Sequence, residues 1–349
     1  MPGNQLPPEP RLTEGVTEVC ANGTCHMAGA SAAASAAPLS SAMAPRQGVS
    51  STAASPTVRS FVLQNARSQA LHTVEYKPAG PASARLVWHH GLAEHCGRYD
   101  AMFRTLAASG IAVHSFDAHG HGRSQPTEAQ DRAVIWEFQH LLDDLALVVG
   151  DALRGAEVEG EAAVPMFLGG QSMGGLVAAH AALGSQPAWS GLILHSAALG
   201  VEWTPVLKAQ APVGALLGKL LPRARIVPAV RPEDMSPDPK AVAAYMSDPL
   251  NTVGPVAART GAVLLDAFQS LAKRNAAFTL PIYAAHGTHD KCTSLPAVRR
   301  MVSEASSRDK QLREVEGGYH ELLLGEEADN CIRPLVAWIQ QHAAPRSKL

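Results

Sequence analysis

The chain has 349 residues, a formal net charge of -2, 46% hydrophobic residues and 17% charged residues. This length accommodates one large domain or two small ones, and a chain of this size buries enough surface to fold without disulfides. The near-zero charge argues against a nucleic-acid-binding protein, which would carry a basic excess, and five cysteines without a framework spacing argue against a disulfide-rich secreted fold.

The first 56 residues differ from the rest of the chain. Residues 29–56 consist mainly of Ala and Ser and carry a single charge, Arg46. Side chains this small bury too little surface to offset the entropy of an ordered chain, so residues 1–56 are predicted to be disordered. The uncharged run 19–45 lacks the Leu, Ile and Phe density of a membrane span.

From residue 57 the pattern becomes globular, and strands alternate with helices. Residues 58–63 and 70–76 are expected to form an edge hairpin. Buried strands are expected at residues 85–90, 111–116, 164–168, 192–195, 280–286 and 311–315. Helices are expected at residues 99–108, 133–154, 173–184, 295–304 and 328–342. This alternation predicts an α/β fold with a mostly parallel central sheet and helices on both faces.

Residues 198–278 interrupt the alternation. They are richer in Pro and in helix signals than in strands, and residues 206–221 are mostly apolar. We interpret this block as a helical cap inserted between two core strands; the alternative is two further helices of the core. The apolar stretch suits either a lid that touches a lipid surface or a cap helix packed on the core.

The strongest chemical signal is Gly170-Gln-Ser172-Met-Gly174, which follows the strand 164–168 and opens the helix 173–184. This is the G-x-S-x-G pattern of a nucleophile elbow, in the strand–turn–helix setting that the motif requires. A serine hydroxyl is a weak nucleophile unless a base removes its proton. Ser172 is therefore predicted to be a catalytic nucleophile that acts together with a base.

The acid and the base of such a site should follow in the order Ser, Asp or Glu, His. Asp290 and His320 each follow an expected strand, so both fall at the sheet edge where Ser172 lies. In these roles His320 would take the serine proton and later protonate the leaving alcohol, while Asp290 would fix the imidazole tautomer. His289 and Asp266 are rival polar groups for the role of Asp290.

An oxyanion hole requires two main-chain N–H groups. Met173, directly after the predicted nucleophile, is one expected donor, and the first turn of its helix adds a positive dipole. Leu92, in the loop after the strand 85–90, is the other.

Two groups of possible metal ligands lack metal-site spacing. Cys20 and Cys25-His26 do not form a haem or zinc motif, and no second pair of ligands follows. Asp117-Ala-His119-Gly-His121 lacks the acidic and histidine partners of a metallohydrolase. We therefore predict no metal and no cofactor, and we interpret the second group as a tight structural loop at the carboxyl edge of the sheet.

Four motifs occur in this order along the chain: His90-Gly-Leu-Ala-Glu-His-Cys-Gly-Arg-Tyr99, Asp117-Ala-His-Gly-His-Gly-Arg-Ser124, Gly170-Gln-Ser-Met-Gly-Gly175 and Gly317-Gly-Tyr-His320. Together they resemble the monoacylglycerol lipases of the α/β-hydrolase fold, over residues 58–343. The resemblance implies cleavage of monoacylglycerol to fatty acid and glycerol through an acyl-enzyme on Ser172, without a cofactor. It also implies that Glu94 and Arg98 lie near the glycerol end of the pocket, although a salt bridge that anchors the loop would explain them equally.

Three residues depart from the pattern of that family. Leu92 is bulkier than the small residue usual at its place, and Leu323 stands where the animal enzymes have a second histidine. Cys292 lies close to where related enzymes have a thiol, which raises inhibition by thiol reagents as a hypothesis. Other readings within the fold are a lysophospholipase or carboxylesterase, an acyltransferase, and a non-catalytic lipid-binding member. Ser172 excludes an epoxide hydrolase or dehalogenase, which would need Asp there.

The chain ends in Ser347-Lys348-Leu349, the tripeptide of a peroxisomal address. We therefore expect a hydrolase domain over residues 57–346, a targeting tripeptide at 347–349 and a peroxisomal import receptor as partner, with the cytoplasm as the alternative location. A small lipid ester is the expected substrate, peripheral membrane contact through the cap is a further expectation, and no nucleic acid is expected to bind.

Overall fold

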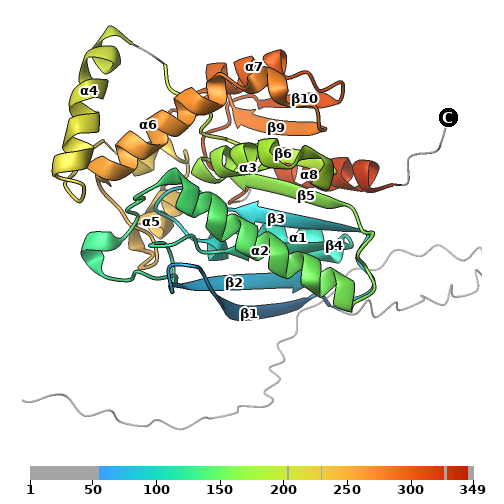
Figure 1. The fold of residues 1–349 in the computed structure, drawn as a ribbon. Helices are drawn as coiled ribbons and strands as arrows, with labels where there is room; N and C mark the ends of the chain where they lie inside the picture. The colour runs from blue at the N-terminus through green and yellow to red at the C-terminus, as the bar shows by residue number, and fades with distance from the viewer. Residues whose placement is uncertain (1–54, 203, 229, 326–327, 345–349) are drawn as a thin grey trace, which may run out of the picture. The chain divides into compact units, whose positions relative to one another are not determined.

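A central sheet of eight strands organises the computed structural model, which describes residues 55–202, 204–228, 230–325 and 328–344. The strands lie in the order β1-β2-β4-β3-β5-β6-β9-β10 (Figure 1). Their bounds are β1 Thr57–Gln64, β2 Ala70–Lys77, β3 Ala84–His89, β4 Ile111–Phe116, β5 Met166–Gln171, β6 Gly191–His195, β9 Ile282–Gly287 and β10 Lys310–Val315. The predicted disordered segment, except its last two residues, and the C-terminal tripeptide lie outside the described residues.

The strands are antiparallel at one edge of this sheet and parallel in the rest of it. β1 pairs antiparallel with β2 in continuous register, and β2 pairs antiparallel with β4, so the predicted edge hairpin is confirmed. The other neighbours, from β4 across to β10, pair in parallel. Every residue of β3, β4, β5, β6 and β9 is buried, as expected for parallel strands covered on both faces.

Two hydrophobic clusters hold the helices against the two faces of the sheet. The α-helices of the core are α1 Asp100–Ala108, α2 Phe138–Val158, α3 Met173–Gly184, α7 Leu295–Glu304 and α8 Asp329–Ala343. One cluster joins α2, α3 and α7 to strand residues such as Val87, and the other joins α1 and α8 to alternate residues such as Leu86 and Trp88. This period-2 division confirms the predicted doubly wound architecture.

The segment between β6 and β9 is mainly helical, as expected for an inserted cap. It contains α4 Pro205–Leu220, β7 Arg225–Val227, α5 Pro239–Ser247, β8 Val256–Ala257 and α6 Ala258–Ala272. The side chain of Asp238 accepts a hydrogen bond from the Lys240 main-chain N–H and caps α5, whose first residue is proline. The antiparallel pair of β7 and β8 was not expected from the sequence. Short 3-10 turns lie at Cys96–Tyr99, Ala129–Asp131, Gln186–Ala188, Pro232–Asp234 and Asn275–Ala277.

The helix expected at residues 133–154 begins later, at Phe138. Ala133 has a φ of 54°, which a helix does not accommodate. The Ile135 main-chain N–H donates to the Thr260 hydroxyl (2.9 Å), which itself donates to the Ala133 carbonyl (3.0 Å). Attachment to the cap thus overrides the helical periodicity of this stretch. Within the described residues, no helix combines the length and the apolarity that crossing a bilayer requires.

Candidate active site

Ser172 lies at a sharp turn between β5 and α3. Its backbone has φ 54° and ψ -122°, a region that costs on the order of 1–3 kcal/mol for a residue other than glycine. A Cβ on Gly174 would lie 2.0 Å from the His89 carbonyl oxygen, and a Cβ on Gly170 would lie 2.4 Å from the Gly174 carbonyl carbon. Both positions therefore require glycine. Ser172 is partly accessible although both of its neighbours are buried.

Asp290 and His320 meet at the same edge of the sheet. Asp290 follows β9, His320 follows β10, and His320 Nδ1 lies 2.9 Å from Asp290 Oδ2. Because the carboxylate accepts the Nδ1 proton, a neutral His320 leaves its Nε2 lone pair free. Burial alone would lower the pKa of His320, but the hydrogen bond to Asp290 and the negative charge of Asp290 raise the pKa above its ordinary value.

The Asp290 carboxylate has no exposed surface and is surrounded by donors. Oδ1 accepts from the main-chain N–H groups of Cys292 (2.8 Å) and Thr293 (3.0 Å). Oδ2 accepts from the Thr293 hydroxyl (2.7 Å) and lies 3.2 Å from Nε2 of the buried His286. Burial favours the neutral acid, but the hydrogen bonds from His286 and His320 outweigh it and hold the pKa of Asp290 well below its usual range. The carboxylate is therefore ionised and fixed.

Two of these partners were missed in the sequence. His286 and Thr293 flank Asp290 at four and three residues along the chain. His286 could have been found in the sequence, because it stands at the end of a predicted buried strand and close to the predicted acid. Of the rivals of Asp290, Asp266 lies on the exposed side of α6, and His289 packs edge-on against the Tyr319 ring.

Two free main-chain donors lie near Ser172, Leu92 on the loop after β3 and Met173 at the start of α3. Among the described residues, neither the Leu92 nor the Met173 N–H has a hydrogen-bond acceptor. Leu92 lines the same cavity as Ser172 and His320. A Cβ on Gly91 would lie 3.2 Å from the Ser172 Cβ, so this loop lies directly against the serine.

Glu94 is buried and anchors this loop. Its Oε1 accepts from the Gly91 N–H (2.5 Å) and from the Tyr99 hydroxyl (2.5 Å), while Oε2 pairs with Arg98. Arg98 also pairs with Glu321, the residue after His320, and is not among the residues that line the cavity. The loop-anchoring salt bridge, one of the two expectations for Glu94 and Arg98, is present. Contact with glycerol stays a prediction.

The same loop is tied to the cap. His95 Nε2 lies 2.9 Å from Asp248 Oδ2, and the Thr252 N–H donates to the Ala93 carbonyl (2.8 Å). Cap side chains form the roof of the cavity above Ser172, among them Arg225, Val230, Met235, Tyr245 and Val256. The cavity has a volume of only about 50 Å³, room for a few water molecules.

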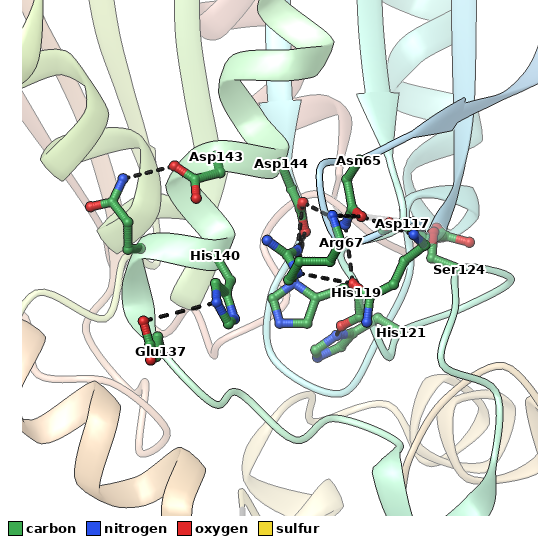
Figure 2. A network of polar contacts seen from close by, with 12 residues as sticks. Asn65, Arg67, Asp117, His119, His121, Ser124, Glu137, His140, Asp143 and Asp144 are labelled. Atoms are coloured by element: carbon green, nitrogen blue, oxygen red, sulfur yellow. Dashed lines mark hydrogen bonds and ion pairs between the residues drawn. The ribbon is translucent and has the colours of Figure 1, made fainter.

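The histidines that gather at this edge form structural hydrogen bonds. His90 Nδ1 contacts the Gly91 carbonyl, and its Nε2 accepts from the Ala118 N–H. Figure 2 shows His119 directed at Asp144, a buried carboxylate that also binds Arg67. Burial lowers the pKa of His90 well below its ordinary value and that of His121 to about 3, so both rings are neutral.

The three departures noted in the sequence have different surroundings. Leu92 lines the cavity, where its bulk takes up space. Leu323 is buried in the hydrophobic core cluster that contains α8, where it packs against apolar side chains. Cys292 is a partly exposed residue, and burial and the charge of Asp290 raise the pKa of its thiol above the ordinary value. A raised pKa reduces the thiolate fraction and argues against ready alkylation.

Known proteins resemble this chain in sequence and in fold. The model of the serine aminopeptidase S33 family matches residues 80–328. The monoacylglycerol lipase of Mycolicibacterium smegmatis is 30% identical over 259 residues, 74% of this chain and 88% of that protein. The monoglyceride lipase of Rattus norvegicus is 31% identical over 289 residues, 81% of this chain and 90% of that protein.

Solved structures extend the likeness. The crystal structure of Paleococcus ferrophilus monoacylglycerol lipase has a TM-score of 0.66 and 27% identity, and covers 78% of this chain and 99% of that one. A soluble variant of Saccharomyces cerevisiae monoglyceride lipase has a TM-score of 0.71 at 19% identity, with 83% and 97% covered. The predicted fold class is thereby confirmed.

Replacing Glu94 by alanine tests the anchor of the loop. The change leaves the Gly91 N–H and the Tyr99 hydroxyl without an acceptor and removes one partner of Arg98, so we expect the free energy of unfolding to fall by about 3 kcal/mol. Urea denaturation followed by circular dichroism measures it. Glu157→Ala, at an exposed position of α2, should change stability by less than about 0.5 kcal/mol. A loss for Glu94→Ala as small as that of the control would contradict the anchoring role.

Proposed function

The chain belongs to the serine aminopeptidase S33 family, with the α/β-hydrolase fold, and we propose that it hydrolyses monoacylglycerol, or a similar single-chain lipid ester, to a free fatty acid and glycerol. It is a serine ester hydrolase by this membership and by its lipase relatives. One observation carries the proposal: the strained Ser172, His320 with its Asp290 partner, and Leu92 with its free N–H all line one cavity beneath the cap.

The proposed reaction uses these groups in two half-reactions. The Ser172 oxygen attacks the ester carbonyl while His320 Nε2 takes its proton, and the Met173 and Leu92 N–H groups stabilise the oxyanion. His320 then protonates the glycerol oxygen as the carbon–oxygen bond breaks, which leaves an acyl-enzyme. Water attacks this ester in the same way, with its proton taken by His320, and releases the fatty acid. Asp290 holds the imidazole orientation throughout, and no step requires a cofactor.

The roof of the cavity fits an acyl chain better than a polar substrate. Val230, Met235 and Val256 are apolar cap residues above Ser172. A cavity of about 50 Å³ is small for a fatty acyl chain, so we infer that cap side chains move when substrate enters. Apolar walls that close over the chain would also exclude water from the reacting ester.

A substrate panel on the full chain tests the proposal. We expect monoacylglycerol to be cleaved with a higher kcat/KM than diacylglycerol, lysophospholipid, short soluble esters and amino-acid anilides. Ser172→Ala should lower kcat by about 10⁴-fold or more, because the nucleophile is lost. A preference for lysophospholipid would indicate a lysophospholipase, and predominant transfer to added alcohol would indicate an acyltransferase. Monoacylglycerol cleavage that survives Ser172→Ala would contradict the mechanism.

The pH dependence of kcat/KM tests the roles of Asp290 and His320. Only neutral His320 can accept the serine proton, so activity falls as the pH drops below its pKa, and the raised pKa puts this acidic limb above the ordinary value of 6.5. Asp290→Asn should lower kcat by about 10⁴-fold and move the limb to lower pH. Asp266→Asn, at the exposed rival position on α6, should leave both quantities unchanged. An unshifted limb in Asp290→Asn would reject the assignment.

We also propose that the cap touches lipid surfaces. Val213, Leu216 and Leu220 recur at helical spacing on α4 and are each more than half exposed. We expect Leu216→Asp/Leu220→Asp to weaken sedimentation with phosphatidylcholine vesicles by about tenfold or more, because each leucine contributes roughly 1.5–3 kcal/mol when buried. Val158→Asp, at an apolar position 88% exposed on α2, serves as control. If both variants lose vesicle binding equally, α4 is not the surface that contacts the lipid.

Import into peroxisomes is a separate proposal. It rests on the sequence Ser347-Lys348-Leu349, which lies outside the described residues. Deletion of this tripeptide from a fluorescently tagged full chain should move the protein from peroxisomes to the cytoplasm. Peroxisomal fluorescence that survives the deletion would contradict import by this signal.

A further inference from the structure

Cys292 has no role in the proposed reaction, yet its thiol lies among the reacting groups. One donor atom each from Asp290, Cys292 and His320 lie within 4.8 Å of one another. Asp290 and Cys292 share the loop between β9 and α7, and His320 reaches them from the loop after β10. Carboxylate, thiolate and imidazole are the three side-chain ligands that Zn²⁺ prefers.

We propose that these three residues form an inhibitory site for Zn²⁺ or a similar thiophilic divalent cation. Zinc lies about 2.3 Å from sulfur and about 2.0 Å from imidazole nitrogen, so three donors spaced within 4.8 Å need only a small inward movement. Water would complete the tetrahedron. The ligand set is soft enough to reject Mg²⁺, which requires octahedral oxygen ligands.

The metal would inhibit by fixing the wrong tautomer of His320. The ring nitrogen that faces Asp290 is Nδ1, at 2.9 Å, and in the active form it carries a proton. Coordination at Nδ1 requires that proton to move to Nε2 through solvent, while the Cys292 thiol releases its proton to water. A protonated Nε2 cannot accept the proton of Ser172. Inhibition by this route rests on the proposed function; metal binding does not.

Three carboxylates lie around this place, and two of them have ion-pair partners of their own. The charges of Asp290, Asp234 and Glu321 all act on the Cys292 thiol, and Arg231 opposes them. Arg231 and Lys291 both pair with Asp234, while Glu321 pairs with Arg98. These carboxylates disfavour a bare thiolate, but the same negative charges attract a divalent cation. The charge of a bound cation would then stabilise the thiolate.

A second triplet of potential ligands offers a useful contrast. His72, Cys96 and Asp117 also bring donor atoms within 4.8 Å of one another. As at Asp290, the carboxylate oxygens of Asp117 already accept hydrogen bonds, here from the main-chain N–H groups of Cys96 and Arg123, so the two triplets differ in exposure. Cys96 is only 1% exposed, whereas Cys292 is partly accessible. The triplet at Cys292 therefore lies closer to solvent than the triplet at Cys96.

Cobalt provides a readout that does not depend on catalysis. Full-length protein is treated with chelator and titrated with Co²⁺, whose bond to a thiolate gives a charge-transfer absorption band. We expect one Co²⁺ per chain with this band, displaced by Zn²⁺, and no band in Cys292→Ser. The double variant Cys20→Ser/Cys25→Ser removes two of the other thiols of the chain and should retain the band. A band that survives Cys292→Ser, or that is lost in the double variant, would overturn the site.

Inhibition is measured on a soluble ester at buffered free Zn²⁺. Cys292→Ser keeps the main-chain N–H that donates to Asp290, and each variant is compared with its own metal-free rate. We expect half-inhibition of Cys292→Ser to need at least about tenfold more Zn²⁺ than that of the unchanged chain and of the double variant, and Mg²⁺ to inhibit none of them. Equal sensitivity to Zn²⁺ would refute the proposal. If the metal-free chain has no esterase activity, the proposed function fails, while the cobalt band still decides the metal site.

Discussion

The close approach of β3 to the first turn of α3 is the constraint on which the site depends. No side chain fits at Gly174, because a Cβ there would lie 2.0 Å from the His89 carbonyl oxygen. With glycine, α3 begins directly after Ser172, and its free N-terminal N–H groups and positive dipole lie at the carboxyl edge of the sheet. The chain that leaves β3 at His89 then lies beside the serine, so one backbone contact brings Ser172 and the proposed oxyanion donors together.

The second constraint is the buried carboxylate of Asp290. It is kept ionised by donors from its own loop, from β9 and from His320, so its orientation needs no rearrangement during a reaction. The loop that supplies these main-chain donors also holds the Cys292 thiol. The carboxylate and the imidazole serve the proposed hydrolysis, and together with the thiol they form the proposed site for a soft metal.

Sequence reasoning predicted that the candidate site residues meet, because parallel strands end at one edge of the sheet. Ser172, Asp290 and His320 each follow a strand, so their convergence could be predicted without knowing any distance. The ion pair between Arg98 and Glu321 could not, because it joins loops more than 220 residues apart. The start of α2 was misplaced for the same reason: Thr260 of the cap, far along the chain, holds residues 133–135 out of the helix.

The central claim, that Ser172 is the nucleophile activated by the site, is tested most directly by a covalent probe. The full chain is treated with a fluorophosphonate, which reacts with activated serines, and the modified peptide is identified by mass spectrometry. The account predicts one adduct per chain, on Ser172, whose formation slows when His320 is replaced by alanine. An adduct on another serine, or no adduct on a folded protein, would contradict it.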